Sequence, residues 1–489
     1  MAPGGSGAHY RAIFDRRSPE AIHQLALIKR FLERVTGDDE FKAEVMALAQ
    51  SGASLEAFSQ ANDVGLALDG LLPLMTPIDA EAYAAGVESG RFALAAAWRA
   101  YTGEMLVHRA FVRDAGACAV NPAFDIWRNR QISRCSGELG ASAGSIVHPV
   151  IAFELSDGCS VGCWFCGISA AKFKGAFPYA GNEAIWRGVL EATRDFFGEA
   201  AETGFCYWAT DPIDNPDYAR FIEDFYHVIG SMPQTTTAAA LRNLEATRKI
   251  LALFDKYRCI TNRFSILNRR TLRAVHATFT PDELMGVELV MQQREGNVSK
   301  ASAGRVRSRA IARGEAVPDG PATTIACVTG FLVNMVLGRV QLVTPTRASD
   351  RWPNGYWIIG ERYFDDAAGY AAALKDLADA HMTDRVQSTD CFRLRQDVSV
   401  ALVADGLELS DSAYRHDMKM PFGDAVAAML AEGTYSVGDA LCRLVLDGAD
   451  FFQASAMMQS LFVSGLLDED PMTRSAAVAE PSPDLLVIE

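Results

Sequence analysis

The sequence has little positive charge, few cysteines for its length and no apolar N-terminal stretch. Its 46 Lys and Arg against 61 Asp and Glu leave a net charge of −15, which argues against nucleic acid or an anionic membrane as the main partner. Ten cysteines in 489 residues are too few for a disulfide scaffold. The opening MAPGGSGAHYRAIFDRR lacks the apolar core of a secretory signal. We therefore expect a cytoplasmic protein whose reduced cysteines are free to bind metal.

Long hydrophobic runs are also scarce, although 49% of the residues are hydrophobic and a sizeable core is possible. The stretch 320–338 has no charged side chain and approaches the length of a membrane span. Pro321, three threonines and Asn334 make it too polar and too interrupted for hydrocarbon. It predicts a buried strand followed by a short helix, in a soluble protein.

The hydrophobic periodicity divides the chain into five segments. Apolar runs alternate with helical patterns from His148 onward, which is typical of parallel strand–helix units and predicts an α/β protein with a partial six-unit barrel. The turn-rich passage RCSGELGASAGS precedes this change, and 294–321 reads as an insertion or mobile loop near the barrel mouth. The predicted segments are a flexible N-terminus (1–18), a helical region (19–147), the barrel (148–350), an extension (351–420), and a winged-helix-like module with a tail (421–489).

The C-terminal module does not look like a DNA reader. Residues 421–470 contain one basic residue, Arg443, against eight acidic ones, whereas phosphate binding needs clustered cations. We therefore expect this module and the N-terminal helices to contact peptide.

Three closely spaced cysteines are the most informative feature. Cys159, Cys163 and Cys166 lie in GCSVGCWFCG, directly after the strand-like run VIAFELS, where a barrel places its chemistry. Three thiolates at this spacing can bind one four-iron four-sulfur cluster and leave the fourth iron without a protein ligand. A structural zinc site would need a fourth ligand, and neither Cys135 nor Cys206 belongs to a second cysteine pair. Three unrelated buried thiols are the remaining alternative.

This CxxxCxxC motif after a first strand resembles the radical S-adenosylmethionine (SAM) superfamily. The resemblance implies one four-iron cluster whose open iron chelates SAM, and a 5′-deoxyadenosyl radical released by one-electron reduction. It implies that Phe165 lies against the adenine and that Trp164 shields the cluster, although Trp164 could equally belong to the core. By the same resemblance, the remaining SAM contacts are expected at Thr210 and Asp211 in ATDP, where Asp211 departs from the family's glutamate, at Ser265, and at Asn334, which could equally cap a helix.

Phrases flanking the motif resemble the radical SAM peptide epimerases of the polytheonamide type. These are WRNRQISRCSGELG, HPVIAFELSDGCSVGCWFCGISA, RWPNGYWIIGERYF and DCFRLRQDVSVAL. The resemblance implies that L-residues of a ribosomally made precursor peptide become D-residues, with a thiol returning hydrogen to Cα. It places that donor at Cys391, with Cys327 and Cys206 as alternatives. We expect Cys442, in ALCRLVL, to belong to the core.

The resemblance further implies two partners, a precursor peptide and a flavodoxin- or ferredoxin-type electron donor. IKRFLERVTGDDEFKAEVMALAQSG is similar to helical Nif-eleven-like leader peptides, or is an ordinary helical cap on the barrel. Two alternatives remain open for the function. The protein could make another radical modification, such as C-methylation or backbone excision, or it could be a non-catalytic iron–sulfur or leader-binding scaffold.

Overall fold

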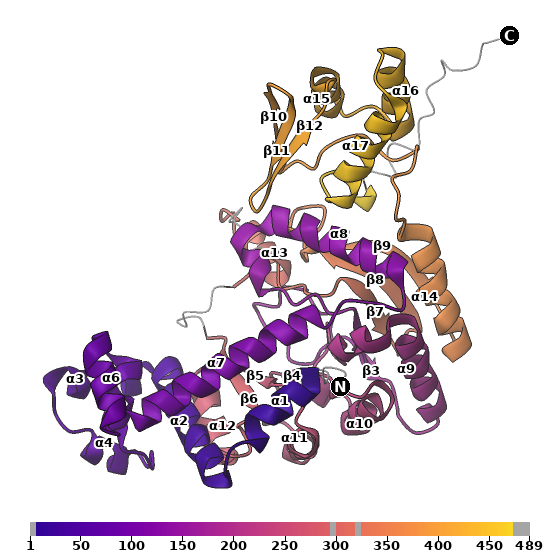
Figure 1. The fold of residues 1–489 in the computed structure, drawn as a ribbon. Coiled ribbons are helices and arrows are strands. Elements are labelled where there is room, and N and C mark those ends of the chain that lie inside the picture. The colour runs from indigo at the N-terminus through magenta and orange to yellow at the C-terminus, as the bar shows by residue number, and fades with distance from the viewer. Residues whose placement is uncertain (1–5, 294–299, 318–323, 473–489) are drawn as a thin grey trace.

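A computed structural model describes residues 6–293, 300–317 and 324–472, beginning with a helical N-terminal region. Figure 1 shows α3, α4 and α6 gathered at one end of the molecule, with the long α7 running from them toward the sheets. The helices of this region are α1 (Ser6–Asp15), α2 (Pro19–Gly37), α3 (Asp39–Ser51), α4 (Glu56–Ala61), α5 (Leu72–Met75), α6 (Ala80–Glu88), α7 (Ala93–Asp114) and α8 (Pro122–Leu139), with short 3₁₀ turns η1 (Leu68–Leu71) and η2 (Gly140–Ser145).

Helix α1 differs from the flexible N-terminus expected for residues 1–18; residues 1–5 lie outside the described chain. Tyr10, Ile13 and Phe14 are buried, and their i, i+3, i+4 spacing puts all three on one face of the helix. That face packs in a common cluster with Leu25 of α2 and Tyr101 of α7. Apolar contact therefore orders a segment whose Gly/Ser-rich beginning suggested a flexible tail.

Helix α8 replaces much of the predicted turn-rich passage, since RCSGEL forms its last turns. Arg134 is fully buried there and ends on an ion pair with Glu138 at 2.7 Å. Its guanidinium also donates to the Thr344 hydroxyl at 3.1 Å and to the Pro345 carbonyl at 2.6 Å. The bonds to Thr344 and Pro345 satisfy a buried charge through residues far away in the sequence, so the local turn pattern could not predict them.

Parallel strands form the centre of the molecule, and isolated bridges from one residue, Phe205, connect two of the sheets. The first sheet has the order β1-β7-β8-β9 and the second has the order β4-β5-β6. Phe205 makes parallel bridges to Ala152 of β1 and to Gln234, just before β4. The strands are β1 (Ile151–Glu154), β4 (Thr236–Thr237), β5 (Asn262–Ile266), β6 (Val287–Met291), β7 (Gly330–Asn334), β8 (Arg339–Pro345) and β9 (Tyr356–Tyr363), with a small β2 (Ser156–Asp157) and β3 (Gly175–Ala176) pair.

The mixed α/β class is confirmed, and the strand order refines the barrel expectation. Parallel pairing runs from β7 through β1, Phe205, β4 and β5 to β6. The strand at 330–334, last of the predicted six, thus pairs with the first strand, whereas a serial barrel would place it beside the fifth. The helices of this region are α9 (Glu183–Phe197), α10 (Tyr218–Ile229), α11 (Leu244–Tyr257), α12 (Arg269–Thr278), α13 (Gly304–Ala312) and α14 (Ala367–His381), with 3₁₀ turns η3 (Gly198–Thr203) and η4 (Pro212–Asp214).

The uncharged stretch 320–338 forms a strand and a turn over its described residues, 324–338. β7 is followed by a turn into β8, its antiparallel partner, so the short helix expected after the strand is wrong for this part of the chain. Gly330 has φ +154, and a Cβ there would collide with the Val150 carbonyl oxygen. Across the described residues, the helices are all too short or too polar to cross a bilayer.

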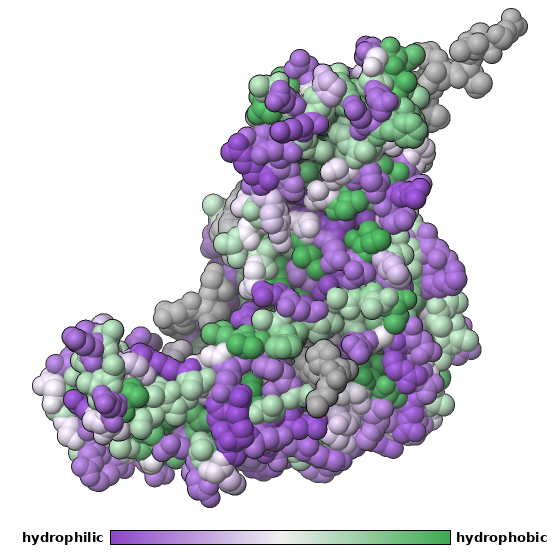
Figure 2. Space-filling model, in the orientation of Figure 1, coloured by the Kyte–Doolittle hydropathy of each residue, from purple (hydrophilic) through white to green (hydrophobic). Residues whose placement is uncertain are grey.

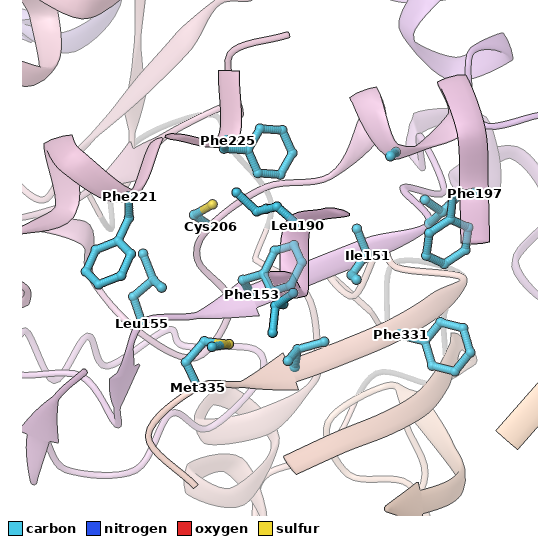
Figure 3. Close-up of a cluster of buried hydrophobic side chains, with 14 of the residues drawn as sticks. Ile151, Phe153, Leu155, Leu190, Phe197, Cys206, Phe221, Phe225, Phe331 and Met335 are labelled. Carbon is cyan, nitrogen blue, oxygen red and sulfur yellow. The ribbon is translucent and has the colours of Figure 1, made fainter. Parts of the chain in front are cut away.

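The main core lies between β1, β7 and the helices α9 and α10. Ile151 and Phe153 of β1 and Leu155, just after the strand, project to one side, toward Leu190, Phe221 and Phe225 (Figure 3). Phe331 and Met335 continue the same layer from β7. Ala152 and Glu154 therefore face the opposite side of the sheet, because side chains alternate along a strand.

The C-terminal residues divide differently from the expected boundaries at 351 and 421. β9 pairs with β8, and Tyr370, Leu374 and Leu377 of α14 join the main core, so these elements pack with the barrel strands. A separate core then unites Phe392 with the remaining sheet and helices. These are β10 (Ser399–Val403), β11 (Gly406–Ser410), β12 (Arg415–Lys419), α15 (Gly423–Glu432), α16 (Val437–Leu446) and α17 (Phe451–Val463), here called the C-terminal module.

The C-terminal module has its three-stranded antiparallel sheet before its three helices, so the winged-helix likeness concerns the helices alone. Cys442 is exposed on α16, which corrects its expected place in the core, because α16 buries Val437, Ala440 and Leu444 instead. Hydrophobic and hydrophilic residues are mixed over the face of the molecule seen in Figure 2.

Candidate metal centre

The three cysteines of the motif lie together on a loop that leaves β2, here called the cysteine loop (residues 158–170). Cys159, Cys163 and Cys166 are partly buried free thiols. The loop turns at Gly158 and Gly162, with φ values of +81 and +67, a conformation that glycine adopts without strain. At its start, Cys159 donates its backbone N–H to the Ala171 carbonyl at 2.9 Å.

The donor set fits a cluster of positively charged iron. Burial first, and then the neighbouring Cys159 and Cys166, raise the pKa of Cys163 to about 11. Bound cations would offset the mutual repulsion of thiolates at this place. The backbone N–H of Ala170 donates to Cys166 Sγ at 3.3 Å, and such hydrogen bonds to sulfur tune iron–sulfur clusters.

A site for a single metal ion is not formed by the described residues of the cysteine loop. Within residues 6–293, 300–317 and 324–472, no three His, Cys, Asp or Glu side chains form a group that could hold one. A four-iron cluster binds each thiolate to a different iron, so its ligands spread more widely than those of one ion. The cysteine loop therefore fits an iron–sulfur cluster through its three thiols and the N–H that donates to Cys166 Sγ.

One end of the cysteine loop is tied to the segment that follows ATDP. Ser160 donates its backbone N–H to Asp214 Oδ2 at 2.8 Å and its hydroxyl to the other carboxylate oxygen. Arg242 pairs with the same carboxylate at 2.9 Å. Asp214, two residues after ATDP, thus joins this segment to the cysteine loop, as a shared site at the carboxyl ends of the parallel strands requires.

Phe165 and Trp164 lie beside the thiols with their rings 5.5 Å apart and almost perpendicular. Both side chains are partly exposed, and the Lys300 ammonium lies 5.4 Å from the centre of the Phe165 ring. A partly exposed ring is accessible to a planar ligand. The contact of Phe165 with adenine stays a prediction.

Glu154 is a candidate site residue that the sequence pattern did not single out. It ends β1, is 5% exposed, and accepts from the Ala209 N–H at 3.0 Å and from Asn334 Nδ2 at 2.8 Å. Burial raises the pKa of its carboxyl. Asn334 also accepts from the Leu337 N–H at 3.0 Å, so it caps the turn after β7. A charged residue inside the otherwise apolar run VIAFEL was the available signal.

Thr210 and Asp211 occupy the turn after Ala209, but their surroundings differ. Asp211 is 4% exposed and accepts from the Thr237 hydroxyl at 2.7 Å and the Ala238 N–H at 2.8 Å. Burial raises the pKa of this carboxyl. The Asp211 carboxylate thus ties the turn to the end of β4, while Thr210 is the more exposed of the two. Their role in binding SAM stays a prediction.

Ser265 lies in β5, partly buried, on the strand face opposite the buried Phe264 and Ile266. Arg263 shares its face and pairs with Glu288 of β6 at 2.9 Å. Nearby, the Tyr207 hydroxyl donates to Gln234 Oε1 at 2.6 Å. Polar side chains on this face of the second sheet therefore lie beside Val290, which pairs with Ser265.

The candidate donor thiols occupy three environments. Cys391 belongs to the C-terminal module, where it bridges to Ser436 and its thiol donates to the Gly433 carbonyl at 3.7 Å. Figure 1 shows the helices and strands of that module on one side of α8, with β3 and β7 on the other. Cys206 is buried in the main core. Cys327 is partly exposed and packs beside the inner sheet cluster that includes Phe205 and Ala152.

Together, these features define a mixed α/β protein with a three-thiol loop at the carboxyl ends of its parallel strands. The chain belongs to the same family as the uncharacterized protein y4wI of Sinorhizobium fredii (strain NBRC 101917 / NGR234), to which it is 42% identical over 471 residues, covering 95% of this chain and 91% of that protein. No family model matches the sequence. The crystal structure of BtrN in complex with AdoMet and 2-DOIA is similar over 40% of this chain and 72% of that one, with a TM-score of 0.28 and 15% identity. A likeness at that level is too low to support an argument.

Proposed function

We propose that this protein is a radical SAM enzyme that inverts L-residues to D-residues in a ribosomally made precursor peptide. The observation that supports it is the cysteine loop, with three free thiols after β2 and a direct tie to the ATDP turn through Asp214. The flanking phrases that resemble peptide epimerases support the finer activity.

In this proposal Cys159, Cys163 and Cys166 hold one four-iron four-sulfur cluster. When bound, the cluster and SAM supply a 5′-deoxyadenosyl radical that removes the Cα hydrogen of the residue to be inverted. Glu154, through the Ala209 N–H and Asn334, orients the strand ends around that site. Asp211 fixes the adjoining turn through Thr237, while Phe165, Thr210 and Ser265 remain accessible to the ligand.

The chain's own chemical step is the return of hydrogen by Cys391. Its S–H bond breaks as a new C–H bond forms on the opposite face of Cα, which leaves a sulfur radical. One electron from a flavodoxin- or ferredoxin-type donor and one proton from solvent restore the thiol. Because the thiol proton exchanges with water, turnover in deuterated water places deuterium at each inverted Cα.

Anaerobic reconstitution with iron, sulfide, SAM and reductant tests the proposal in two stages. Formation of 5′-deoxyadenosine supports radical SAM chemistry, and its absence from cluster-loaded protein contradicts it. With a candidate precursor peptide and deuterated water, D-residues carrying one deuterium support epimerisation. A mass gain of a methyl group, or loss of backbone atoms, would instead identify another radical modification.

A further inference from the structure

We infer that Arg305, at the start of α13, is the positioning residue that holds the cysteine loop in the shape that binds its cluster. This inference rests on the proposed function. Arg305 comes from the segment expected to be an insertion or mobile loop, and it lies 142 positions after Cys163 and 135 after Ala170. Sequence proximity therefore plays no part in the contact.

Three contacts from Arg305 converge on backbone carbonyls of the cysteine loop. Its Nη1 donates to the Cys163 oxygen at 2.9 Å, and its Nη2 donates to the Ala170 oxygen. Its backbone N–H donates to the Cys166 oxygen at 2.9 Å. Two of these carbonyls belong to the proposed iron ligands themselves, so a displacement of Arg305 would move the thiols.

The loop's own hydrogen bonds between nearby residues are longer than those from Arg305. Cys166 donates to the Cys163 oxygen, and Ser169 to the Cys166 oxygen, each at 3.3 Å. Bonds of that length lie beyond the usual range for an N–H donor. The charged, planar guanidinium supplies shorter bonds at a spacing set by its rigid fork, so it fixes the separation of the two carbonyls.

Helix α13 approaches the loop at backbone contact. Gly304 has φ +56, and a Cβ there would collide with the carbonyls of Cys166 and Gly167. Its N–H donates to the Pro353 oxygen at 2.8 Å, which anchors the helix start to the segment before β9. Arg305 is thus fixed on both sides, by the helix behind it and by the loop in front.

The positive charge of Arg305 adds an electrostatic role. Arg305 contacts the main chain of Cys163 and Cys166, two of the proposed iron ligands, and outer contacts of this kind orient metal ligands and change the affinity and potential of the centre. A lysine retains the charge but is a point donor without the fork, so it separates the effect of charge from that of geometry.

The test compares Arg305→Gln and Arg305→Lys with Arg309→Gln, an exposed arginine on the same helix. In metal-free full-length protein, hydrogen–deuterium exchange should rise in peptides covering 159–170 for Arg305→Gln and stay at the wild-type level for Arg309→Gln. Peptides from β1 and α9 report the overall fold. Faster exchange there as well as in the loop would overturn a local role.

The second readout uses reconstituted protein challenged with an iron chelator. Arg305→Gln should lose iron about tenfold faster than wild type, Arg305→Lys should fall between them, and the paramagnetic resonance spectrum of the reduced cluster should change. Equal iron loss in Arg305→Gln and Arg309→Gln would overturn the inference. If wild-type protein binds no cluster, the proposed function fails, while the exchange comparison still decides whether Arg305 holds the loop.

Discussion

The cysteine loop and the C-terminal module each contain a cysteine expected to take part in chemistry, but they are held in place in different ways. The loop has no core of its own, and its ends are tied by Asp214 and Arg305 from distant parts of the chain. Cys391 lies in a module with a separate apolar core. Its neighbours Asp390 and Phe392 are held by main-chain bonds to Val437 and Tyr435, at 2.8 and 2.9 Å.

Helix α8 contacts the C-terminal module through buried charge. Arg130 pairs with Glu469 at 3.0 Å and lies 3.9 Å from the centre of the Phe462 ring in α17. Arg395 of the module pairs with Asp411 and packs against Gly137 of α8. A hydrogen donor in the module must reach the same Cα from which the radical removed hydrogen, whereas Cys327 packs against Ala152 of β1 and Phe205.

The largest expected effect follows loss of a loop thiol. Cys163→Ala should abolish cluster binding and SAM cleavage, because two thiolates cannot replace three at a four-iron cluster. Cys442→Ala in the module should retain about four iron and four sulfide, like wild type. Iron and sulfide analysis after anaerobic reconstitution measures both. Full iron and sulfide loading of Cys163→Ala would show that Cys163 is not a ligand of the cluster.

The next effect separates the two regions by chemistry. Cys391→Ala should form the cluster and 5′-deoxyadenosine but should not complete inversion, because abstraction precedes hydrogen return. Cys327→Ala should invert normally. Chiral analysis of the peptide after turnover in deuterated water measures the outcome. Normal inversion by Cys391→Ala together with failure of Cys327→Ala would transfer the donor role to the sheet.

A third test breaks the ion pair between α8 and the C-terminal part of the chain. Arg130→Met leaves the side chain of Glu469, 8% exposed, without its ion-pair partner and should lower the free energy of unfolding by about 3 kcal/mol. Arg415→Met removes an arginine with a 66% exposed side chain within the module and should cost at most about 1 kcal/mol. Denaturant titration at neutral pH measures both. Equal shifts would show that the α8 contact is no stronger than a surface pair.

The smallest effect concerns the entry to β1. Burial lowers the pKa of His148 to about 3, so between that value and its unfolded pKa of about 6.5 the unfolded chain binds the extra proton. Stability should therefore fall as pH decreases, by about 1 kcal/mol from pH 7.5 to 5.5 for this residue. His148→Asn, which tolerates the backbone φ of +54, should reduce that loss. An unchanged pH dependence of stability in His148→Asn would contradict the assignment of this effect to His148.

Several elements were predictable because their signals are local. The strands around Phe153, Phe264 and Leu289 follow from apolar runs bounded by helical patterns. The thiol spacing placed Cys159, Cys163 and Cys166 on one loop at a strand end. The separate core around Phe392 was not predictable in the same way, because it joins residues before β10 with three helices that follow β12.

The sequence alone determined the α/β class, the thiol loop and the main alternation of strands and helices between β1 and β6, since these depend on periodicity and short-range spacing. Only the tertiary structure decided that β7 pairs with β1, that Arg134 is buried in a helix rather than exposed in a turn, and that Arg305 holds the loop. Each of these is a contact between residues far apart in the chain. The free energy of such a contact comes from burial and from hydrogen bonds that exist only after folding. The local sequence pattern therefore does not predict which residue is the partner.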